Sequence, residues 1–318
     1  MNTGEKLKIE VSRVIVGQES ILEKLAAAMF AGGHVLLVGV PGLAKTLMVK
    51  TLAKALGLSF SRIQFTPDLM PTDIIGTDIL EDDLETGRKI FRFHKGPVFA
   101  NVILADEINR TPPKTQSALL EAMQELSVTA GGKTYRLEPP FFVLATQNPI
   151  EQEGTYPLPE AQLDRFAFQL NLNYPDEKEE LEIVERTTSG ALPEPQPVIS
   201  REEITAAREE VFSKTVPPHV YAYAVRLARA TRPGESPLEI VKKYVLWGAG
   251  PRASQWLILG AKALAWLRGD PVPTSLHIKE IAHDVMRHRV ILNFHAEADG
   301  ITVDGLVDEL LKKVPVES

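Results

Sequence analysis

A loop with the sequence Gly-Val-Pro-Gly-Leu-Ala-Lys-Thr, residues 39–46, limits most strongly what this chain can fold into. It follows the apolar run Val35–Val38 and precedes a stretch in which methionine and leucine recur every four residues, as in an amphipathic helix. A strand that leads through a glycine-containing loop into a helix directs backbone N–H groups and a helix dipole toward one point, which suits a polyphosphate. The loop predicts a nucleotide site on an α/β fold. The alternative is a Gly-Pro turn whose surface lysine caps a helix.

The loop residues have separate expected roles in this phosphate site. Lys45 is expected to place positive charge at the β- and γ-phosphates, and Thr46 to offer a hydroxyl to magnesium. Ala44 stands where the common pattern Gly-x-x-x-x-Gly-Lys-Ser/Thr has its second glycine, and its methyl group predicts a backbone near ordinary helical angles. The residues expected to surround the nucleotide here are Gly39, Val40, Pro41, Gly42, Leu43, Ala44, Lys45, Thr46 and Leu47.

A second short apolar run, Val102–Ala105, ends in the adjacent carboxylates Asp106 and Glu107. Successive side chains diverge at a strand end, so the two acids can serve different purposes. Asp106 is expected to hold the magnesium shell, and Glu107 to polarise the attacking water. The alternative is a strand that stops at a polar turn, but the upstream phosphate loop favours a Walker B element.

Composition narrows the class of protein further. The 318 residues, 44% hydrophobic and 24% charged, can bury a sizeable core and predict two domains. The chain has no cysteine, which excludes disulfides and thiolate metal sites, and its net charge of −7 argues against a broad nucleic-acid-binding surface. We expect a cytoplasmic protein, because the N-terminus is polar and Lys262 interrupts the longest apolar region, Trp256–Leu267.

The chain divides into an α/β part and a helical part. Residues 1–190 alternate apolar runs with helical stretches, as in a parallel sheet; the expected strands are Val35–Val38, Phe60–Phe65, Val102–Ala105, Phe141–Thr146 and Phe166–Leu172. A proline-rich connector, residues 191–200, follows. Residues 201–318 predict an all-helical domain without strands, with helices near 201–213, 217–230, 252–268, 277–293 and 303–313.

Four further motifs occur in a fixed order around the loop and the acid pair. They are Ile15-Val-Gly-Gln18, Phe142–Asn148, Leu163-Asp-Arg-Phe166 and Gly248–Ala253. Together they resemble the motifs of AAA+ ATPases, and most closely those of the MoxR family, over nearly the whole chain. The resemblance implies a P-loop NTPase fold with a parallel five-stranded sheet flanked by helices, followed by a helical lid.

The resemblance also implies roles for residues outside the loop. Val16 and Gly17 match the segment that packs on adenine. Asn148 stands at the sensor 1 position, where it would hydrogen-bond the attacking water or the γ-phosphate; the alternative is a turn before Pro149.

Two arginines complete the implied site. Arg165 matches the arginine finger, which reaches the γ-phosphate held by a neighbouring subunit; the alternative is an ion pair with Asp164 or Glu160. Arg252 matches sensor 2, which approaches the nucleotide from the lid; the alternative is a loop arginine exposed to water.

Two hairpins are expected between these motifs. The first lies in an insert at about 73–93 with a turn near Glu85–Gly87, and the second spans about 126–138 around Gly131-Gly132. In related ATPases such hairpins face a central pore and move substrate; the alternative is that they are surface decoration.

The function implied is hydrolysis of ATP with Mg²⁺ by a ring, most simply a hexamer, that remodels protein clients in a chaperone-like way. For MoxR relatives the clients typically carry a von Willebrand factor A domain, and the role is maturation or metal insertion. Two alternatives stay open: a DNA-directed AAA+ motor, and a nucleotide-gated scaffold with negligible hydrolysis.

Overall fold

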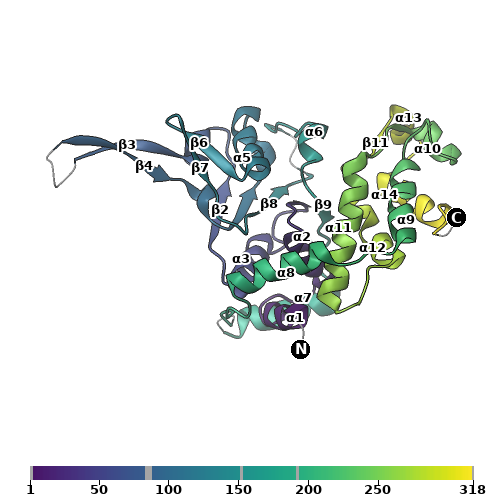
Figure 1. The fold of residues 1–318 in the computed structure, drawn as a ribbon, viewed down its shortest axis with the longest axis horizontal. Helices are drawn as coiled ribbons and strands as arrows, with labels where there is room; N and C mark the ends of the chain where they lie inside the picture. The colour runs from purple at the N-terminus through teal and green to yellow at the C-terminus, as the bar shows by residue number, and fades with distance from the viewer. Residues whose placement is uncertain (1–2, 83–87, 151–152, 191–192, 317–318) are drawn as a thin grey trace. The chain divides into compact units, whose positions relative to one another are not determined.

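The computed structural model describes residues 3–82, 88–150, 153–190 and 193–316 and contains a parallel five-stranded sheet (Figure 1). In spatial order its strands are β2 (Phe60–Gln64), β5 (Val102–Asp106), β8 (Phe142–Gln147), β1 (Val35–Val38) and β9 (Phe168–Asn171). The predicted five-stranded sheet is confirmed: β1 has the bounds expected, and the ends of the other strands differ from those expected by at most two residues.

The sheet aligns the strand ends that carry the polar motifs. The first four residues of β5 and of β8 are fully buried and apolar, as expected for parallel strands covered on both faces. They pair in parallel with Ala105 opposite Ala145, and Gln64 of β2 lies opposite Asp106. This register brings the carboxyl ends of β2, β5 and β8 to the same edge.

The chain forms two compact units, each discontinuous in sequence. Unit 1 comprises Met1–Val35, Pro159–Leu170 and Glu202–Ser318, and unit 2 comprises Leu36–Leu158 and Asn171–Arg201. The boundaries run through β1 and β9. The simpler division into residues 1–190, a connector at 191–200 and residues 201–318 stays a prediction.

The helices of unit 2 connect its strands. The helix α3 begins at the end of the phosphate loop, and α5 begins with a proline at its first turn, where the missing N–H is not needed. The helical elements are α3 (Lys45–Ala55), α4 (Pro71–Ile75), η1 (Pro97–Phe99), η2 (Ile108–Arg110), α5 (Pro113–Glu125) and α7 (Glu177–Thr188).

Unit 2 also carries two antiparallel hairpins. One consists of β3 (Gly76–Asp82) and β4 (Lys89–Lys95), and the other of β6 (Ser127–Ala130) and β7 (Lys133–Arg136). Gly131 and Gly132 join β6 to β7 with positive φ at both positions, as a two-residue hairpin turn requires. The turn expected near Glu85–Gly87 lies outside the described residues.

Unit 1 is built around the long helix α11 (Pro251–Arg268), which packs on α2, α9 and α12. The ring of Trp266 in α11 lies 4.9 Å from that of Phe30 in α2. The other helices are α1 (Thr3–Ser12), α2 (Glu19–Phe30), α6 (Glu160–Leu163), α8 (Arg201–Ser213, which begins at the unit boundary), α9 (Pro218–Arg229), α10 (Glu239–Tyr244), α12 (Ser275–Met286), α13 (Phe294–Ala298) and α14 (Val303–Lys313).

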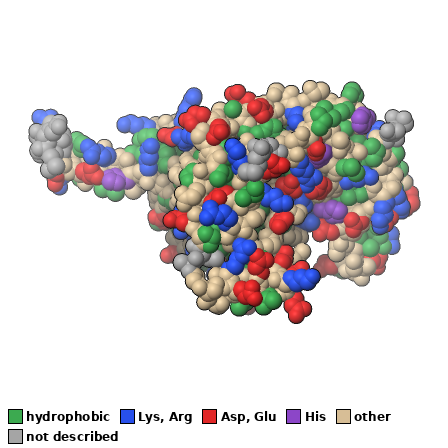
Figure 2. Space-filling view, turned by 90° about the horizontal axis from the view of Figure 1, so that it is seen from below, with side chains coloured by type: hydrophobic (Ala, Val, Ile, Leu, Met, Phe, Trp, Pro, Cys, Tyr) green, Lys and Arg blue, Asp and Glu red, His purple; other side chains and the backbone are tan. Residues whose placement is uncertain are grey.

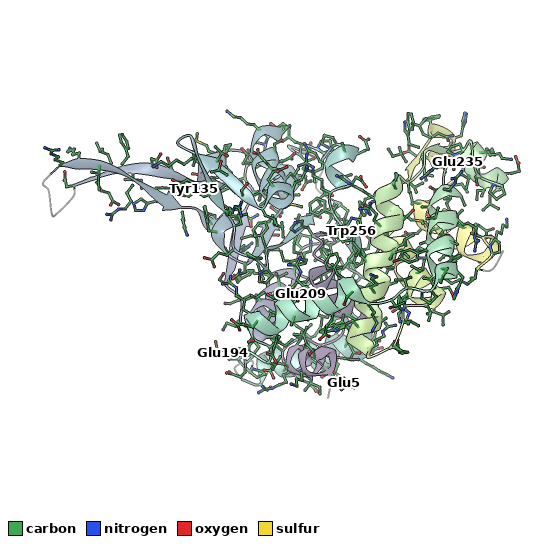
Figure 3. All side chains as sticks on the ribbon, in the orientation of Figure 1. Glu5, Tyr135, Glu194, Glu209, Glu235 and Trp256 are labelled. Carbon is green, nitrogen blue, oxygen red and sulfur yellow. The ribbon has the colours of Figure 1, made fainter. Side chains whose placement is uncertain are left out.

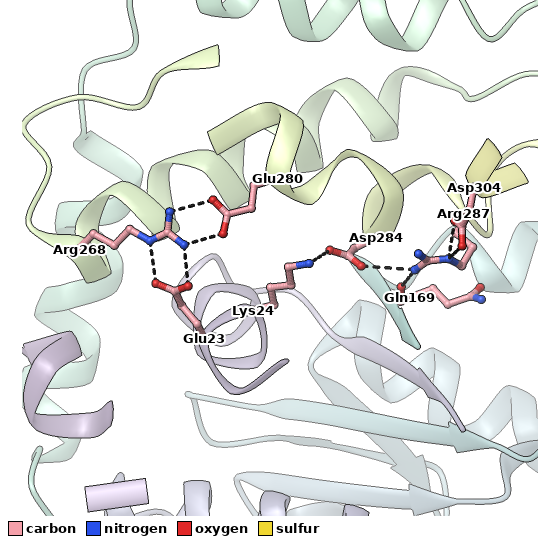
Figure 4. A network of polar contacts seen from close by, with 8 residues as sticks. All are labelled: Glu23, Lys24, Gln169, Arg268, Glu280, Asp284, Arg287 and Asp304. Atoms are coloured by element: carbon pink, nitrogen blue, oxygen red, sulfur yellow. Dashed lines mark hydrogen bonds and ion pairs between the residues drawn. The ribbon is translucent and has the colours of Figure 1, made fainter. Parts of the chain in front are cut away.

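Ion pairs link the helices of unit 1 (Figure 4). Arg268 at the end of α11 donates to Glu23 of α2 and Glu280 of α12, and Lys24 pairs with Asp284 at 2.7 Å. These contacts join α2 to the C-terminal helices, although the two segments are far apart in sequence.

The C-terminal part differs from the prediction in two respects. It is not all helical, because β10 (Val245–Trp247) pairs with β11 (Ile291–Leu292) in a short antiparallel ribbon. The helix expected at 277–293 spans Ser275–Met286 instead, since the following residues form the turn that leads into β11. Neither strand is long enough to show a sequence period of two. Within the described part of the chain, every helix is too short or too polar to cross a membrane.

Candidate nucleotide site

The phosphate loop connects β1 to α3 within unit 2. Gly39 leaves β1 so close to Leu172 that an added Cβ would lie 2.8 Å from the Leu172 Cβ, which explains the glycine. The first N–H groups of α3 lack carbonyl partners within the helix and sit at its positive end. The loop therefore has the strand–loop–helix geometry that binds phosphate.

Ala44 adopts a conformation that the sequence did not predict. Its φ of 52° and ψ of 24° lie in the left-handed region, whereas ordinary helical angles were expected. The expectation was wrong because the chain must reverse between the loop and α3, and Ala44 is the residue that makes this reversal. The loop accepts a Cβ at this position because the Ala44 side chain is exposed.

Lys45, the first residue of α3, points back into the loop. Its Nζ donates a hydrogen bond to the Gly39 carbonyl oxygen. Burial lowers the pKa of Lys45, while the nearby charges of Asp106 and Glu107 act in the opposite direction. The lysine and both acids therefore share one electrostatic environment.

The hydroxyl of Thr146 links the two acids. It donates to Asp106 Oδ1 at 2.6 Å and accepts the Glu107 backbone N–H at 2.9 Å. Thr146 is only 1% exposed, so these contacts are shielded from water. Thr146 is the penultimate residue of β8, beside β5, and its hydroxyl joins Asp106 to the Glu107 backbone.

Arg62 and Gln64 of β2 contact the acids from the other side. Arg62 donates to Asp106 Oδ2 at 2.6 Å, and Gln64 donates to Glu107 Oε2 at 2.9 Å. Glu107 also pairs with Arg110 at 3.2 Å. Its φ of 56° turns the chain sharply after β5, so its side chain departs from the direction of Asp106.

Thr146, Arg62 and Gln64 were not predicted from the sequence, although each has a recognisable signal there. Thr146 is a polar residue at the end of an apolar strand. Arg62 and Gln64 are two residues apart in β2, so both side chains emerge from the same face. Such polar positions beside a predicted acid pair are candidates for contacts with it.

Asn148 follows β8 by one residue and is buried. Its Oδ1 accepts the Ile150 backbone N–H at 3.2 Å, so the turn considered from the sequence is present. This bond uses the oxygen of the amide and leaves Nδ2 as the group that can donate to a phosphate or water.

Unit 1 carries the remaining predicted residues. Val16 and Gly17 precede α2 and are half-buried, and Gly17 has a φ of 66° that turns the chain toward the helix. Arg165 follows α6 and is half-buried. Arg252 is the second residue of α11 rather than a loop residue, and it lies 3.3 Å from Asp164 Oδ2.

The candidate metal ligands are oxygen atoms. The described residues include no group of three or more His, Asp or Glu side chains arranged to hold a metal by themselves. Thr46 and Asp106 are hard oxygen donors, which suit a cation that takes its other ligands from phosphate and water, as Mg²⁺ does. This donor set fits magnesium bound together with a nucleotide.

Comparisons with known proteins agree with this geometry. Residues 34–168 match the model of the ATPase family associated with various cellular activities (AAA), and residues 238–310 match the AAA lid domain. The chain is 46% identical to Chaperone MoxR1 of Mycobacterium tuberculosis, covering 99% of this chain and 82% of that protein.

Two further similarities extend over most of the chain. Protein MoxR of Methylorubrum extorquens is 33% identical, covering 89% of this chain and 86% of that protein. A crystal structure of a Cytophaga hutchinsonii protein superposes with a TM-score of 0.91 at 47% identity, covering 98% of this chain and 94% of the other. On this fold, these motifs and these relatives, the chain belongs to the MoxR family of AAA+ ATPases.

Proposed function

We propose that this protein hydrolyses ATP at the loop formed by residues 39–47 and uses the energy to remodel protein clients. The observation that carries the proposal is the Thr146 hydroxyl, which holds Asp106 and the Glu107 backbone together beside Lys45. The Glu107 carboxylate itself is held by Gln64 and Arg110. A site that only bound nucleotide would not need this second acid beside the magnesium ligand.

Within unit 2, each side chain has a distinct role in this proposal. Lys45 neutralises phosphate charge, and Glu107 accepts a proton from the attacking water. Gln64 and Arg110 keep the Glu107 carboxylate oriented through its Oε2. Asn148 Nδ2 orients the water or the γ-phosphate. The chain thus supplies positioning and charge, which is most of what phosphoryl transfer requires.

Thr46 and Asp106 would hold magnesium, which supplies charge neutralisation at the phosphates when bound. Asp106 Oδ1 is oriented by Thr146, while Oδ2 accepts from Arg62. Arg62 is half exposed, so it can exchange this contact for water.

The roles of the other predicted residues rest on the family resemblance. It assigns Val16 and Gly17 to the adenine and Arg252 to sensor 2. Arg165 serves the nucleotide of a neighbouring subunit, which requires a ring, most simply a hexamer. Cytoplasmic localisation stays a prediction from the sequence.

The two hairpins are the surface that we assign to protein clients. The rings of Phe93 in β4 and Tyr135 in β7 stack with centroids 4.2 Å apart, and Figure 3 shows Tyr135 at the base of the β3–β4 ribbon. A Cβ at Gly131 would lie 2.1 Å from Asp78 Oδ2, so the ribbon and the second hairpin touch at two places. The hairpins can therefore move together.

The ribbon also offers surface for binding. Leu80 and Phe91 lie directly opposite each other, and Phe91 is 74% exposed. Figure 2 shows charged and histidine side chains along the same ribbon. Apolar side chains framed by charge suit an unfolded or partly folded protein segment. Clients with a von Willebrand factor A domain, and a role in their maturation or metal insertion, are the specific form of this proposal.

A turnover assay tests the hydrolytic step. Glu107→Gln should bind ATP with near-normal affinity and lose about 10²-fold or more in turnover, since it lacks a proton acceptor. Glu121→Gln, an exposed residue of α5, is the matched control and should keep the normal rate. Equal turnover in Glu107→Gln and the control would contradict the assignment of Glu107. Binding without turnover in the unmodified protein would favour a nucleotide-gated scaffold.

A further inference from the structure

The segment that carries Arg165 is held by three consecutive side chains that follow α12. Arg287 donates to the Gln169 carbonyl oxygen at 2.7 Å (Figure 4), and His288 Nε2 bonds the Phe166 carbonyl oxygen at 3.1 Å. Arg289 donates to the carbonyl oxygens of the same segment. All these residues belong to unit 1. The segment is thus anchored to the helical part of the protein.

Arg289 is the centre of this anchor. Its five N–H groups have five acceptors: Nε donates to Asp164 Oδ1, Nη1 to the carbonyl oxygens of Ala167 and Val285, and Nη2 to those of Asp164 and Phe166. The side chain is 1% exposed, and burial lowers the pKa of Arg289 to about 10. A buried guanidinium with every donor used is fixed in place.

The Asp164 carboxylate is shared between two arginines of unequal burial. Oδ1 accepts from the buried Arg289 at 2.8 Å, while Oδ2 lies 3.3 Å from Arg252, which is 49% exposed. The Arg252 contact is longer and open to water, so it is the weaker of the two. A polyphosphate carries more charge than one carboxylate and would compete for the same guanidinium.

We propose that Asp164 is a positioning residue that couples Arg252, at the nucleotide of its own subunit, to Arg165, at the nucleotide of the neighbour. Arg165 is the next residue in the chain, so gain or loss of the Arg252 contact changes how firmly the backbone of the finger is held, although Arg289 retains its bonds to Asp164. Arg289 keeps the carboxylate in place while Arg252 exchanges between it and phosphate. The inference rests on the roles of Arg165 and Arg252 in the proposed function.

If Asp164 couples the two arginines, altering it should affect the neighbouring subunit, which a purely structural role of Asp164 would not predict. A subunit whose Asp164 is altered should impair hydrolysis in its neighbour, even when its own site cannot hydrolyse ATP. The effect belongs to turnover in the neighbour, because the Asp164 carboxylate bonds Arg252 and Arg289 and is not itself assigned to a nucleotide.

Mixed assemblies test the coupling. Donor protomers carry Glu107→Gln, and the wild-type protomers are diluted into a large excess of donors, so that only wild-type sites turn over ATP and nearly every one of them has a donor as its neighbour. Adding Asp164→Asn to the donors should lower the wild-type rate about two- to fivefold beyond donors with Glu107→Gln alone, the range expected for an ion pair of this exposure. The Michaelis constant of the wild-type sites should stay unchanged.

Three further donors make the result unambiguous. Asp308→Asn removes a carboxylate of the same unit that pairs with His283 instead, and should add no loss. Arg252→Ala keeps the Asp164–Arg289 pair and should reproduce the loss. This variant tests the coupling even if Asp164→Asn fails to fold. Arg165→Ala should give the largest loss, because it removes the finger itself.

The outcomes separate this inference from the proposed function. If Arg165→Ala donors lower the wild-type rate while Asp164→Asn and Arg252→Ala donors do not, the coupling is refuted, but the role of Arg165 in the neighbouring site is supported. If Arg165→Ala donors have no effect either, the finger in trans is refuted and the coupling falls with it.

Discussion

Replacing Ala44 with glycine tests the geometry of the phosphate loop, because the same change has opposite effects in left-handed and right-handed backbone. Ala44 has φ 52° and ψ 24°, which costs an L-residue roughly 1–2 kcal/mol relative to glycine. Glycine also gains freedom in the unfolded chain, which offsets about 0.4–1 kcal/mol. The exposed methyl group contributes little packing. We expect Ala44→Gly to raise the free energy of unfolding of unit 2 by about 0.5–1 kcal/mol.

Amide hydrogen exchange measured by mass spectrometry in α3 and β5 reports this free energy locally. The control is Ala118→Gly in the interior of α5 in the same unit, where glycine should be destabilising by about 1 kcal/mol. Slower exchange in Ala44→Gly and faster exchange in the control is the expected pattern. If both variants lose stability equally, Ala44 is not left-handed and the loop geometry described here is wrong.

Three other perturbations have defined outcomes. Thr146→Val should keep the fold but lower turnover about 10²-fold, since the acid pair loses its shared hydroxyl, whereas Thr146→Ser should retain most of the rate in the same assay. Burial lowers the pKa of His288 well below 6.5, so the unfolded chain binds more protons than the folded chain just below that pH. The free energy of unfolding of unit 1, measured by thermal unfolding, should therefore fall by up to about 1.4 kcal/mol per pH unit below 6.5. His288→Gln should abolish this dependence. Tyr135→Leu should speed exchange of the amides in β4 about two- to tenfold by removing the stack on Phe93, and unchanged exchange would refute the contact between the hairpins.

Much of the α/β part could be predicted because its signals are local. The β5 strand is a continuous apolar run, and the phosphate loop combines a glycine, a lysine and a threonine at fixed spacing. The sheet order could not be read from these runs. It depends on which strands pair in space, and here β5 lies between β2 and β8.

The misses share a physical cause, which is that the deciding contacts are distant in sequence. Thr146 acts on Asp106 across forty positions, and Arg289 acts on Asp164 across 125. The end of α12 was placed too late because Arg287–Arg289 look like further helical positions, yet their side chains bond carbonyl oxygens of residues 164–169. The β10–β11 ribbon was missed because each strand is only two or three residues long.

Ala44 was misjudged for a different reason. Alanine favours helical angles in isolation, and only the reversal between β1 and α3 imposes the left-handed conformation. The preference of alanine for helical angles is a small energy, and the geometry of the phosphate loop outweighs it.

The most direct test of the account is the ATPase rate per protomer measured against protein concentration, with mass determined by light scattering in the same samples. We expect the rate per protomer to rise cooperatively as ring-sized particles form, because Arg165 is proposed to complete the site of a neighbour. A rate per protomer that stays constant while the protein dissociates to monomers would contradict it.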